Sequence, residues 1–292
     1  MADRSAEADI RGINIDKLAK GFADEENIFK KFVTVTSTGA REIRWYQKTS
    51  GFLDTADTTG ITTSHIPNQA AKARPYATEQ TWTRQTSYVR KYFIESPLIT
   101  AEDIRDNDVD ILATNVRDLV RAVARQVDSR IYTVITTATG VLTGASTQDG
   151  WDDLVTGNPI KDILTMKQQI RANGYNPEGA VLAMNSIEHL NLLNFLISVK
   201  GSSIPQFASE KMKNGVVLQL LGVNVVVSEN VPTDEVAMWI PGRTATWKSF
   251  MPITSAVIDE PGIGKKIRVW EEGECICTDV KSVYLLTDTA IA

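Results

Sequence analysis

Side chains suited to catalysis are scarce in this chain of 292 residues. Its two histidines, His65 and His189, are not placed with a serine or cysteine in a nucleophile motif such as G-x-S-x-G. Each is interpreted as a solvated or hydrogen-bonded side chain, which are common roles for histidine. A hydrolase or transferase with a site between two domains is therefore the weakest functional hypothesis.

Two further motifs have the residue types of a metal or phosphate site but not the spacing. Cys275 and Cys277 fall on one face of a strand, because strand side chains repeat every two residues, and zinc would need two more ligands. We expect both to be buried core residues. Residues 261–266 lack the G-x-x-x-x-G-K-[ST] spacing and precede a strand instead of a helix. They predict a turn between strands, and we expect no metal or cofactor.

Basic and aromatic side chains interleave over residues 41–95, which makes this stretch the best candidate for a binding surface. The pattern suits nucleic acid, a protein partner or an ordinary solvated hairpin. We favour a protein partner, because acidic residues dilute the charge and binding through counterion release needs a more uniformly basic patch. The residues concerned are Arg41, Arg44, Trp45, Tyr46, Lys48, Lys72, Arg74, Tyr76, Trp82, Arg84, Tyr88, Arg90, Lys91 and Tyr92.

Composition argues against several classes of function. A net charge of -5 and a pI of about 5.3 are unusual for a protein whose main task is to bind nucleic acid tightly. They do not exclude a protein that encloses nucleic acid without tight contact. No apolar run approaches the ~20 residues of a membrane span, and the N-terminus lacks the apolar core of a secretory signal. Two cysteines are too few for a disulfide framework. We expect a cytoplasmic chain without a membrane partner.

Two strands and a long excursion must position the candidate surface. Residues 42–47 and 78–94 have the β-rich composition of strands. The polar residues 50–73 between them exceed the ~12–15 residues at which a loop becomes unusual in a compact domain, so they are expected to be disordered or to dock elsewhere. Residues 1–27 are polar with isolated apolar positions. They predict either an arm ordered on a neighbouring surface or a frayed terminus.

A long helix follows this loop. Apolar residues recur at steps of three and four from Leu112 to Val134, which predicts a helix over 106–137 with a length of roughly 45 Å. A Gly-, Thr- and Ser-rich connection at 140–157 indicates a domain boundary. A helix then begins at Asn158-Pro159 and is expected to stop at Asn173-Gly174, and another begins near Asn185-Ser186. These helices alternate with strands, and the last forty residues are β-rich. Residues 271–274 predict a hairpin turn.

This order of parts resembles the major capsid proteins of tailed phages, with the Hong Kong 97 phage-type fold that encapsulin shells share. The resemblance covers nearly the whole chain and includes Asn185-Ser186 after a buried strand, the segments 221–225 and 228–232, and a strand ending at Pro241-Gly242. It implies an α+β fold with an N-terminal arm, an extended β-hairpin loop and a spine helix. The implied parts are an arm at 1–30, a peripheral domain at 31–140 with its loop at 41–95 and helix at 106–137, an axial domain at 141–250, and C-terminal strands at 251–292 that return to the peripheral domain.

The resemblance also implies a structural function and no enzymatic one. Copies would form hexamers and pentamers of an icosahedral shell around a viral double-stranded DNA genome, without sequence-specific DNA binding. Scaffolding, portal and decoration proteins would be further partners. The protein would reside in the virion capsid after assembly in the host cytoplasm. An encapsulin-type compartment is the alternative within the same fold.

Within this interpretation the loop clasps a neighbouring copy, while Phe29 and Phe32 tie the arm to the body. Aromatic and arginine side chains are the types most enriched at the centres of protein interfaces. The candidate inter-subunit contact residues are Phe29, Phe32, Trp45, Tyr46, Arg74, Tyr76, Trp82 and Arg84.

Overall fold

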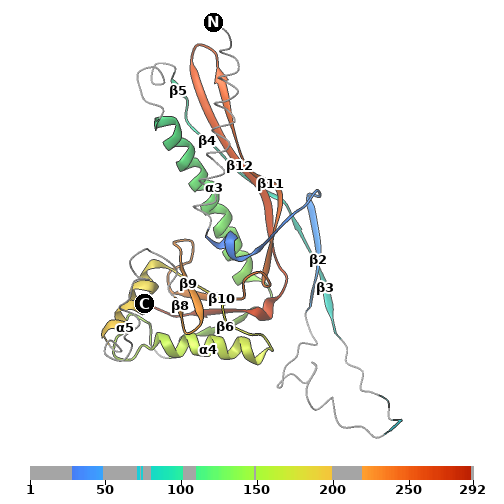
Figure 1. Cartoon of the computed structure of the whole chain (residues 1–292), viewed down its shortest axis with the longest axis vertical. Coiled ribbons are helices and arrows are strands. Elements are labelled where there is room, and N and C mark those ends of the chain that lie inside the picture. The colour runs from blue at the N-terminus through green and yellow to red at the C-terminus, as the bar shows by residue number, and fades with distance from the viewer. Residues whose placement is uncertain are drawn as a thin grey trace.

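The computed structural model describes residues 28–48, 71–72, 74, 80–100, 110–147, 149–198 and 219–290. They form an elongated part, in which a long helix lies along a β ribbon, and a compact part, in which helices accompany a sheet (Figure 1). The elongated part contains β1 (Thr34–Ser37), β4 (Arg90–Glu95), β5 (Ile99–Thr100), α3 (Asp110–Thr137), β11 (Ala245–Glu260) and β12 (Gly264–Cys277). The compact part contains β6 (Leu142–Ala145), α4 (Pro159–Ala172), β7 (Val181–Met184), α5 (Ser186–Ser198), β8 (Gln219–Leu220), β9 (Val223–Val227), β10 (Glu235–Trp239) and β13 (Val283–Thr287).

Three smaller elements complete the described chain. A hairpin of β2 (Glu42–Lys48) and β3 (Trp82–Tyr88) projects away from the junction of the two parts (Figure 1). The 3-10 helix η1 (Phe29–Phe32) packs against α3, and η5 (Val280–Ser282) precedes β13. None of the described helices combines the length and apolar character that crossing a membrane requires.

Helix α3 packs on a sheet with the strand order β1-β11-β12-β4. The apolar stripe that the spacing predicts is buried, with Val116 and Val120 packed among Ile267 and Val269 of β12. The helix is confirmed over 110–137, and residues 106–109 of the predicted span lie outside the described residues. The turn predicted at 261–266 is confirmed at 261–263 between β11 and β12, whereas residues 264–266 already belong to β12. Gly262 there has φ +79°, a left-handed conformation that favours glycine.

The compact part is built on a mixed sheet with the order β6-β13-β10-β7-β9-β8. Helix α4 begins where the Asn158 side chain accepts a hydrogen bond from the Lys161 backbone N–H at 3.2 Å. It ends at Ala172, and Gly174 beyond it has φ +84°, so the predicted stop is confirmed. Its buried residues Ile163 and Met166 pack in one core cluster with Leu182 of the sheet.

A buried carboxylate orders the connection before α4. Asp162 has no exposed surface and accepts hydrogen bonds from Ser146 Oγ at 2.7 Å, Thr147 Oγ1 at 2.6 Å and Trp151 Nε1 at 2.9 Å. Donors to a charged oxygen offset the cost of removing it from water. The composition of this connection indicates only a domain boundary. In the structure, the single side chain of Asp162 holds the connection to the compact part.

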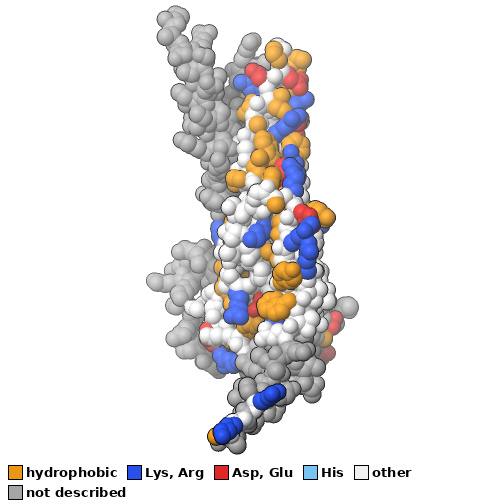
Figure 2. All heavy atoms as spheres, turned by 90° about the vertical axis from the view of Figure 1, so that its right-hand side faces the viewer, with side chains coloured by type: hydrophobic (Ala, Val, Ile, Leu, Met, Phe, Trp, Pro, Cys, Tyr) orange, Lys and Arg blue, Asp and Glu red, His pale blue; other side chains and the backbone are white. Residues whose placement is uncertain are grey.

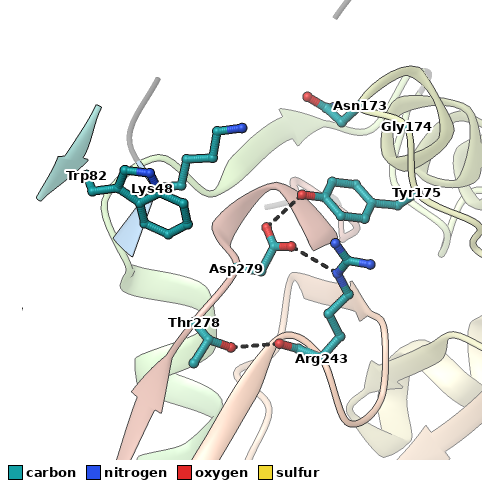
Figure 3. Close-up of a pocket in the computed structure, with 8 residues that line it drawn as sticks. All are labelled: Lys48, Trp82, Asn173, Gly174, Tyr175, Arg243, Thr278 and Asp279. Atoms are coloured by element: carbon teal, nitrogen blue, oxygen red, sulfur yellow. Dashed lines mark hydrogen bonds and ion pairs between the residues drawn. The ribbon is translucent and has the colours of Figure 1, made fainter. Parts of the chain in front are cut away.

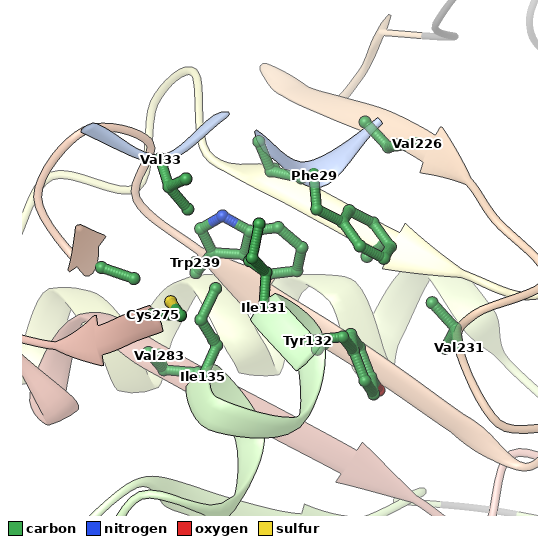
Figure 4. Close-up of a cluster of buried hydrophobic side chains, with 14 of the residues drawn as sticks. Phe29, Val33, Ile131, Tyr132, Ile135, Val226, Val231, Trp239, Cys275 and Val283 are labelled. Carbon is green, nitrogen blue, oxygen red and sulfur yellow. The ribbon is translucent and has the colours of Figure 1, made fainter. Parts of the chain in front are cut away.

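A further cluster of buried side chains joins the elongated and compact parts (Figure 4). Phe29 of η1 stacks on Tyr132 of α3 with ring centroids 5.9 Å apart, and it meets Trp239 of β10 edge-on at 5.6 Å. All three rings are buried. Because Phe29 contacts a helix of one part and a strand of the other, η1 acts as a wedge that fixes their relative position.

The strand predicted at 78–94 is in fact two strands that belong to different sheets. β3 pairs with β2, whereas β4 pairs with β12. The chain crosses between the sheets at Val89, whose N–H donates to the Arg41 carbonyl at 2.9 Å. The alternation of side chains continues through this point, so the local pattern carries no sign of the change of partner.

The hairpin turn predicted at 271–274 is wrong, because these residues lie inside β12. Gly273 is explained by packing: a Cβ atom there would lie 2.5 Å from Cζ2 of Trp247. The acidic residues beside it pair with cations of other segments, as described below. In this chain, Gly273 leaves room for the Trp247 ring inside a strand, and the neighbouring glutamates form ion pairs.

The strands that follow residue 244 are divided between the elongated and the compact part. β12 pairs with β11 and β4 in the elongated part, but β13 pairs with β10 and runs parallel to β6 in the compact sheet. β11 itself begins at Ala245, inside the predicted axial range of 141–250. The division between the parts therefore crosses the chain within the C-terminal strands.

A carboxylate of α3 holds the start of the described chain. Asp128 accepts hydrogen bonds from the backbone N–H of Ile28 at 2.6 Å and of Lys30 at 3.2 Å. Burial raises the pKa of Asp128 to about 6, and the two backbone donors only partly oppose this rise. The carboxyl group therefore binds a proton more tightly in the folded protein than in the unfolded chain.

We predict that Asp128 makes folding stability depend on pH. Because its pKa is raised by folding, its contribution is fully present below about pH 4 and is lost as pH rises through about 6, with a total change of about 3 kcal/mol at most. Urea unfolding of the wild type and of Asp128→Asn should be measured between pH 4 and 7.5. The unfolding free energy of the wild type minus that of the variant should fall as pH rises. A difference that stays constant across this range contradicts the prediction.

Candidate inter-subunit surface

Strands β2 and β3 pair in antiparallel register, which separates their side chains onto two faces. Arg44 lies opposite Thr86, Tyr46 opposite Arg84, and Lys48 opposite Trp82. Opposite residues in a ladder share a face, and the face changes with each residue along the strand. The hairpin therefore has one face with these residues and another with Ile43, Trp45 and Gln47.

The first face, here called the ladder face, is exposed and carries aromatic and basic side chains. Tyr46, Trp82 and Tyr88 expose 65%, 54% and 66% of their surface. The basic residues Arg44 and Arg84 stand between the rings and are exposed. Figure 2 shows this side of the molecule, where hydrophobic and basic side chains gather in alternation with few acidic ones. Large exposed rings beside arginines are typical of the centre of a protein interface.

The second face holds the hairpin against the body. Ile43 and Gln47 are buried, and the Trp45 indole Nε1–H donates to the Cys277 carbonyl at 3.1 Å. Trp45 therefore faces the body of its own chain. Its residue type alone is equally compatible with the exposed face. The opposite orientations of Trp45 and Tyr46 follow from strand geometry, since neighbouring residues point to opposite sides.

The structure separates the predicted contact residues into groups. Tyr46, Trp82 and Arg84 come together on the ladder face, and Arg74 is also exposed. Phe29 is fully buried within its own chain, and Phe32 is partly buried against the same core, so both attach η1 to the body. Tyr76 lies outside the described residues, as does most of the excursion.

Two ladder-face residues were absent from the predicted contact set, namely Tyr88 and Arg44. Tyr88 lies opposite Glu42 on the ladder, and the Arg44 Nε–H donates to Glu42 Oε1 at 2.6 Å. Hydrogen bonding to Arg44 lowers the pKa of the Glu42 carboxyl group. The period of two along 82–88 could have assigned Tyr88 to the same side as Trp82 and Arg84, given the strand boundaries.

A groove of about 300 Å³ separates the far end of the β2–β3 ladder, at Lys48 and Trp82, from the compact part (Figure 3). Lys48 and Trp82 form one side. On the other side, Asp279 accepts hydrogen bonds from the Tyr175 hydroxyl at 3.0 Å and from Arg243 Nε at 3.1 Å. The Arg243 guanidinium also lies over the Tyr175 ring, 4.6 Å from its centroid. Burial, followed by the charge of Asp279, raises the pKa of Tyr175. This set of paired groups braces the wall of the groove.

Strand β12 presents three buried glutamates that gather cations from several segments. Lys30 Nζ of η1 lies 2.5 Å from Glu271, and Arg130 Nη2 of α3 lies 2.6 Å from Glu274. Arg90 Nε of β4 lies 3.1 Å from the second oxygen of Glu274. Glu272 has the longer contacts of 3.6 Å, to Arg41 and to Lys91. This junction holds η1 through Lys30 and the base of the hairpin through residues 41 and 90, which flank β2 and β3.

The described residues offer little for catalysis. They contain no cluster of three His, Cys, Asp or Glu side chains able to hold a metal ion. Cys275 and Cys277 are free and buried, as predicted, and burial raises the pKa of Cys277 to about 12. His189 is half-buried on α5, where burial lowers its pKa, and His65 lies outside the described residues.

Comparison with known proteins identifies the class that this fold defines. A family model described as phage capsid protein matches residues 98–269. That span is more than half of the chain, so the chain belongs to the phage capsid protein family. Comparison with curated proteins gives no match.

Solved structures support the same fold. A virus-like particle from Pyrococcus furiosus matches with a TM-score of 0.65 at 10% identity, covering 94% of this chain and 99% of that one. The capsid of a native GTA particle matches with a TM-score of 0.64 at 14% identity, covering 92% and 91%. The capsid of cyanophage P-SCSP1u matches with a TM-score of 0.61 at 12% identity, covering 89% and 88%. The predicted α+β fold of phage-capsid type is thereby confirmed.

We predict that the Glu274–Arg130 pair is required for stability. Glu274→Gln leaves Arg130 in a largely buried position without its counter-charge, which should cost about 3–5 kcal/mol in the free energy of unfolding. Urea unfolding monitored by tryptophan fluorescence measures the change. The matched control is Glu42→Gln, which breaks the exposed Arg44 pair and should have a much smaller effect. Equal losses in the two variants contradict the prediction.

Proposed function

We propose that this chain is the major structural subunit of an icosahedral capsid, assembled as hexamers and pentamers around a viral double-stranded DNA genome. The family match and the capsid folds of the related structures support this proposal. The observation that carries the assembly role is the ladder face, where three large rings are exposed on a projecting hairpin. Exposed rings gathered on one face are costly to leave in water and favour a protein partner.

The proposed mechanism of assembly is burial of the ladder face against a second copy. Trp82, Tyr46 and Tyr88 supply apolar area, and Arg44 and Arg84 supply polar contacts at its edges. Each contact is modest, but a closed shell repeats it in every subunit and gains stability through multivalency. The net charge of -5 fits a shell that encloses DNA without gripping its sequence.

The finer features of the proposal follow the same reasoning. The capsid of the virion would be the site of action, with assembly in the host cytoplasm. Scaffolding, portal and decoration proteins stay predicted partners. A non-enzymatic role agrees with the family and with a groove whose Asp279, Tyr175 and Arg243 side chains are paired with one another.

An encapsulin-type compartment is the second candidate. It is supported by the likeness in fold to the virus-like particle from Pyrococcus furiosus. The contents of purified particles distinguish the two proposals. Nuclease-protected double-stranded DNA favours the phage capsid, whereas a co-purified cargo enzyme identified by mass spectrometry favours the compartment.

We predict that the ladder face is needed for assembly and not for folding. Replacing Tyr46, Trp82 and Tyr88 by serine should leave circular dichroism and the unfolding midpoint nearly unchanged, because these side chains are exposed. The concentration at which shells form, measured by light scattering and electron microscopy, should rise at least roughly tenfold.

The control retains the rings with Tyr46→Phe, Trp82→Tyr and Tyr88→Phe, and this variant should assemble nearly as the wild type does. Shells of normal size and yield from the serine variant would rule out the ladder face as the assembly contact.

A further inference from the structure

A short loop of the compact part presents apolar side chains to solvent. Residues 149–157 lie between β6 and α4, and within them Val155 exposes 91% and Leu154 exposes 42% of its surface. A single exposed apolar residue is ordinary, but two adjacent ones in a short loop are a candidate contact. Residues 149–157 are here called the acidic loop, because the apolar pair is accompanied by Asp149, Asp152 and Asp153.

Hydrogen bonds hold the acidic loop in one conformation. Thr156 Oγ1 lies 2.7 Å from Asp149 Oδ2 and 2.5 Å from Asp153 Oδ2. The Val155 N–H donates to Asp153 Oδ1 at 2.7 Å, and the Gly157 N–H donates to the Asp153 carbonyl at 2.9 Å. Because the backbone is already ordered, a contact through Val155 costs little conformational entropy.

The acidic loop and the β2–β3 hairpin lie on opposite sides of the molecule. The Trp151 N–H of the loop donates to the Thr289 carbonyl at 2.6 Å, and the next N–H, of Ala290, donates to Asp234 Oδ1 at 2.7 Å. The Asp234 N–H in turn donates to Glu188 Oε1 of α5 at 3.2 Å. The loop therefore lies near α5, which is across the compact part from the hairpin (Figure 1). A contact between the loop and the ladder face thus joins two copies.

The charges of these two surfaces are complementary. Arg44 and Arg84 are exposed on the ladder face, where Glu42 pairs with Arg44. Around the acidic loop, the sequence contains no lysine or arginine from residue 131 to residue 160, and Asp149 is exposed. Rings with arginines on one surface thus match apolar side chains with carboxylates on the other. Such a pair of surfaces gives an interface both apolar area and a fixed register.

Other exposed apolar side chains of the described residues lack this match. Ile187 and Leu190 form an exposed pair on α5, but Glu188 between them in sequence is buried. Phe93 of β4 is exposed and has Lys91 Nζ 5.1 Å from its ring centroid, so its surroundings are basic like the ladder face. The acidic loop is therefore the better partner for a surface of rings and arginines.

We propose that the ladder face of one copy binds the acidic loop of a second copy, with Val155 packed against Trp82 and Asp149 placed toward Arg84. The contact is heterologous, because two different surfaces of the chain meet. Heterologous contacts generate a closed ring when the rotation between successive copies closes. The inference rests on the proposed assembly role of the ladder face and adds the surface that this face contacts.

Cross-linking between separately purified variants tests the contact directly. Thr86→Cys places a thiol on the ladder face and keeps its three rings, and Val155→Cys places one on the acidic loop. The native Cys275 and Cys277 are buried. Under assembly conditions, a short bismaleimide should join the two variants into a dimer only when they are mixed. A chain that carries both substitutions should give a ladder of multimers on a denaturing gel.

The additivity of assembly defects gives a second test. Leu154→Ser with Val155→Ser should raise the concentration at which shells form roughly tenfold, as expected for the serine variant of the ladder face. Because both sets of substitutions remove one contact, combining them should add at most roughly a further twofold, whereas independent contacts would multiply to about a hundredfold. The matched control is Ile187→Ser with Leu190→Ser, which removes an exposed apolar pair of similar size. Any effect of this control should multiply with that of the ladder-face variant.

The outcomes separate this inference from the capsid proposal. Shells that form while the mixed variants give no cross-linked dimer, or defects that multiply, overturn the inference and leave the capsid proposal standing. Non-additivity with the α5 pair in place of the loop assigns the ladder face to α5 and also overturns it. A cross-linked dimer without particles supports the contact and counts against the capsid, and the absence of both overturns both proposals.

Discussion

The carboxylates of Glu271 and Glu274 lie in β12 with no exposed surface, and their need for nearby cations organises the surrounding chain. Removing a carboxylate from water costs several kcal/mol unless charge and hydrogen bonds compensate it. Here the cations come from η1, β4 and α3, through Lys30, Arg90 and Arg130. Segments that are far apart in sequence therefore meet at one strand, and the hairpin base and η1 acquire defined positions.

Beyond this junction, the hairpin changes in character. Its inner face is attached by Ile43 and by the Trp45 indole, whereas its outer face leaves large rings exposed to solvent. A rigidly based, projecting ribbon with exposed rings can meet a partner without a large ordering cost, because its backbone is already paired. The junction thus supports the proposed assembly contact indirectly, by presenting the ladder face in a fixed orientation.

The related capsid structures share 10–14% of their residues with this chain and still have similar folds, with TM-scores of 0.61–0.65. A fold can persist at such identities when the pattern of burial is kept while individual residues change. In this chain the fold consists of the long helix on a β ribbon and the compact mixed sheet.

Local sequence patterns were sufficient for much of the fold and for part of the candidate surface. The spacing of valines predicts α3, Asn158-Pro159 and Asn173-Gly174 delimit α4, and Gly262 marks the turn of the long ribbon. Tyr46, Trp82 and Arg84 were predicted as contacts from residue type, and the structure places them on one exposed face. The helix α3, the ends of α4 and the turn at Gly262 depend on interactions between residues close in the chain, so the sequence alone determines them.

Only the tertiary structure decided the rest, because it depends on partners that are distant in sequence. Residues 82–95 have one continuous alternating pattern, yet β3 and β4 pair with different sheets. Gly273 and the adjacent glutamates have the composition of a turn. The contacts of Gly273 with Trp247 and of the glutamates with cations from three other segments explain why they form a strand instead. Trp45 and Tyr46 are neighbours with similar side chains, and only the packing of the hairpin on the Cys277 carbonyl determines which of them faces solvent.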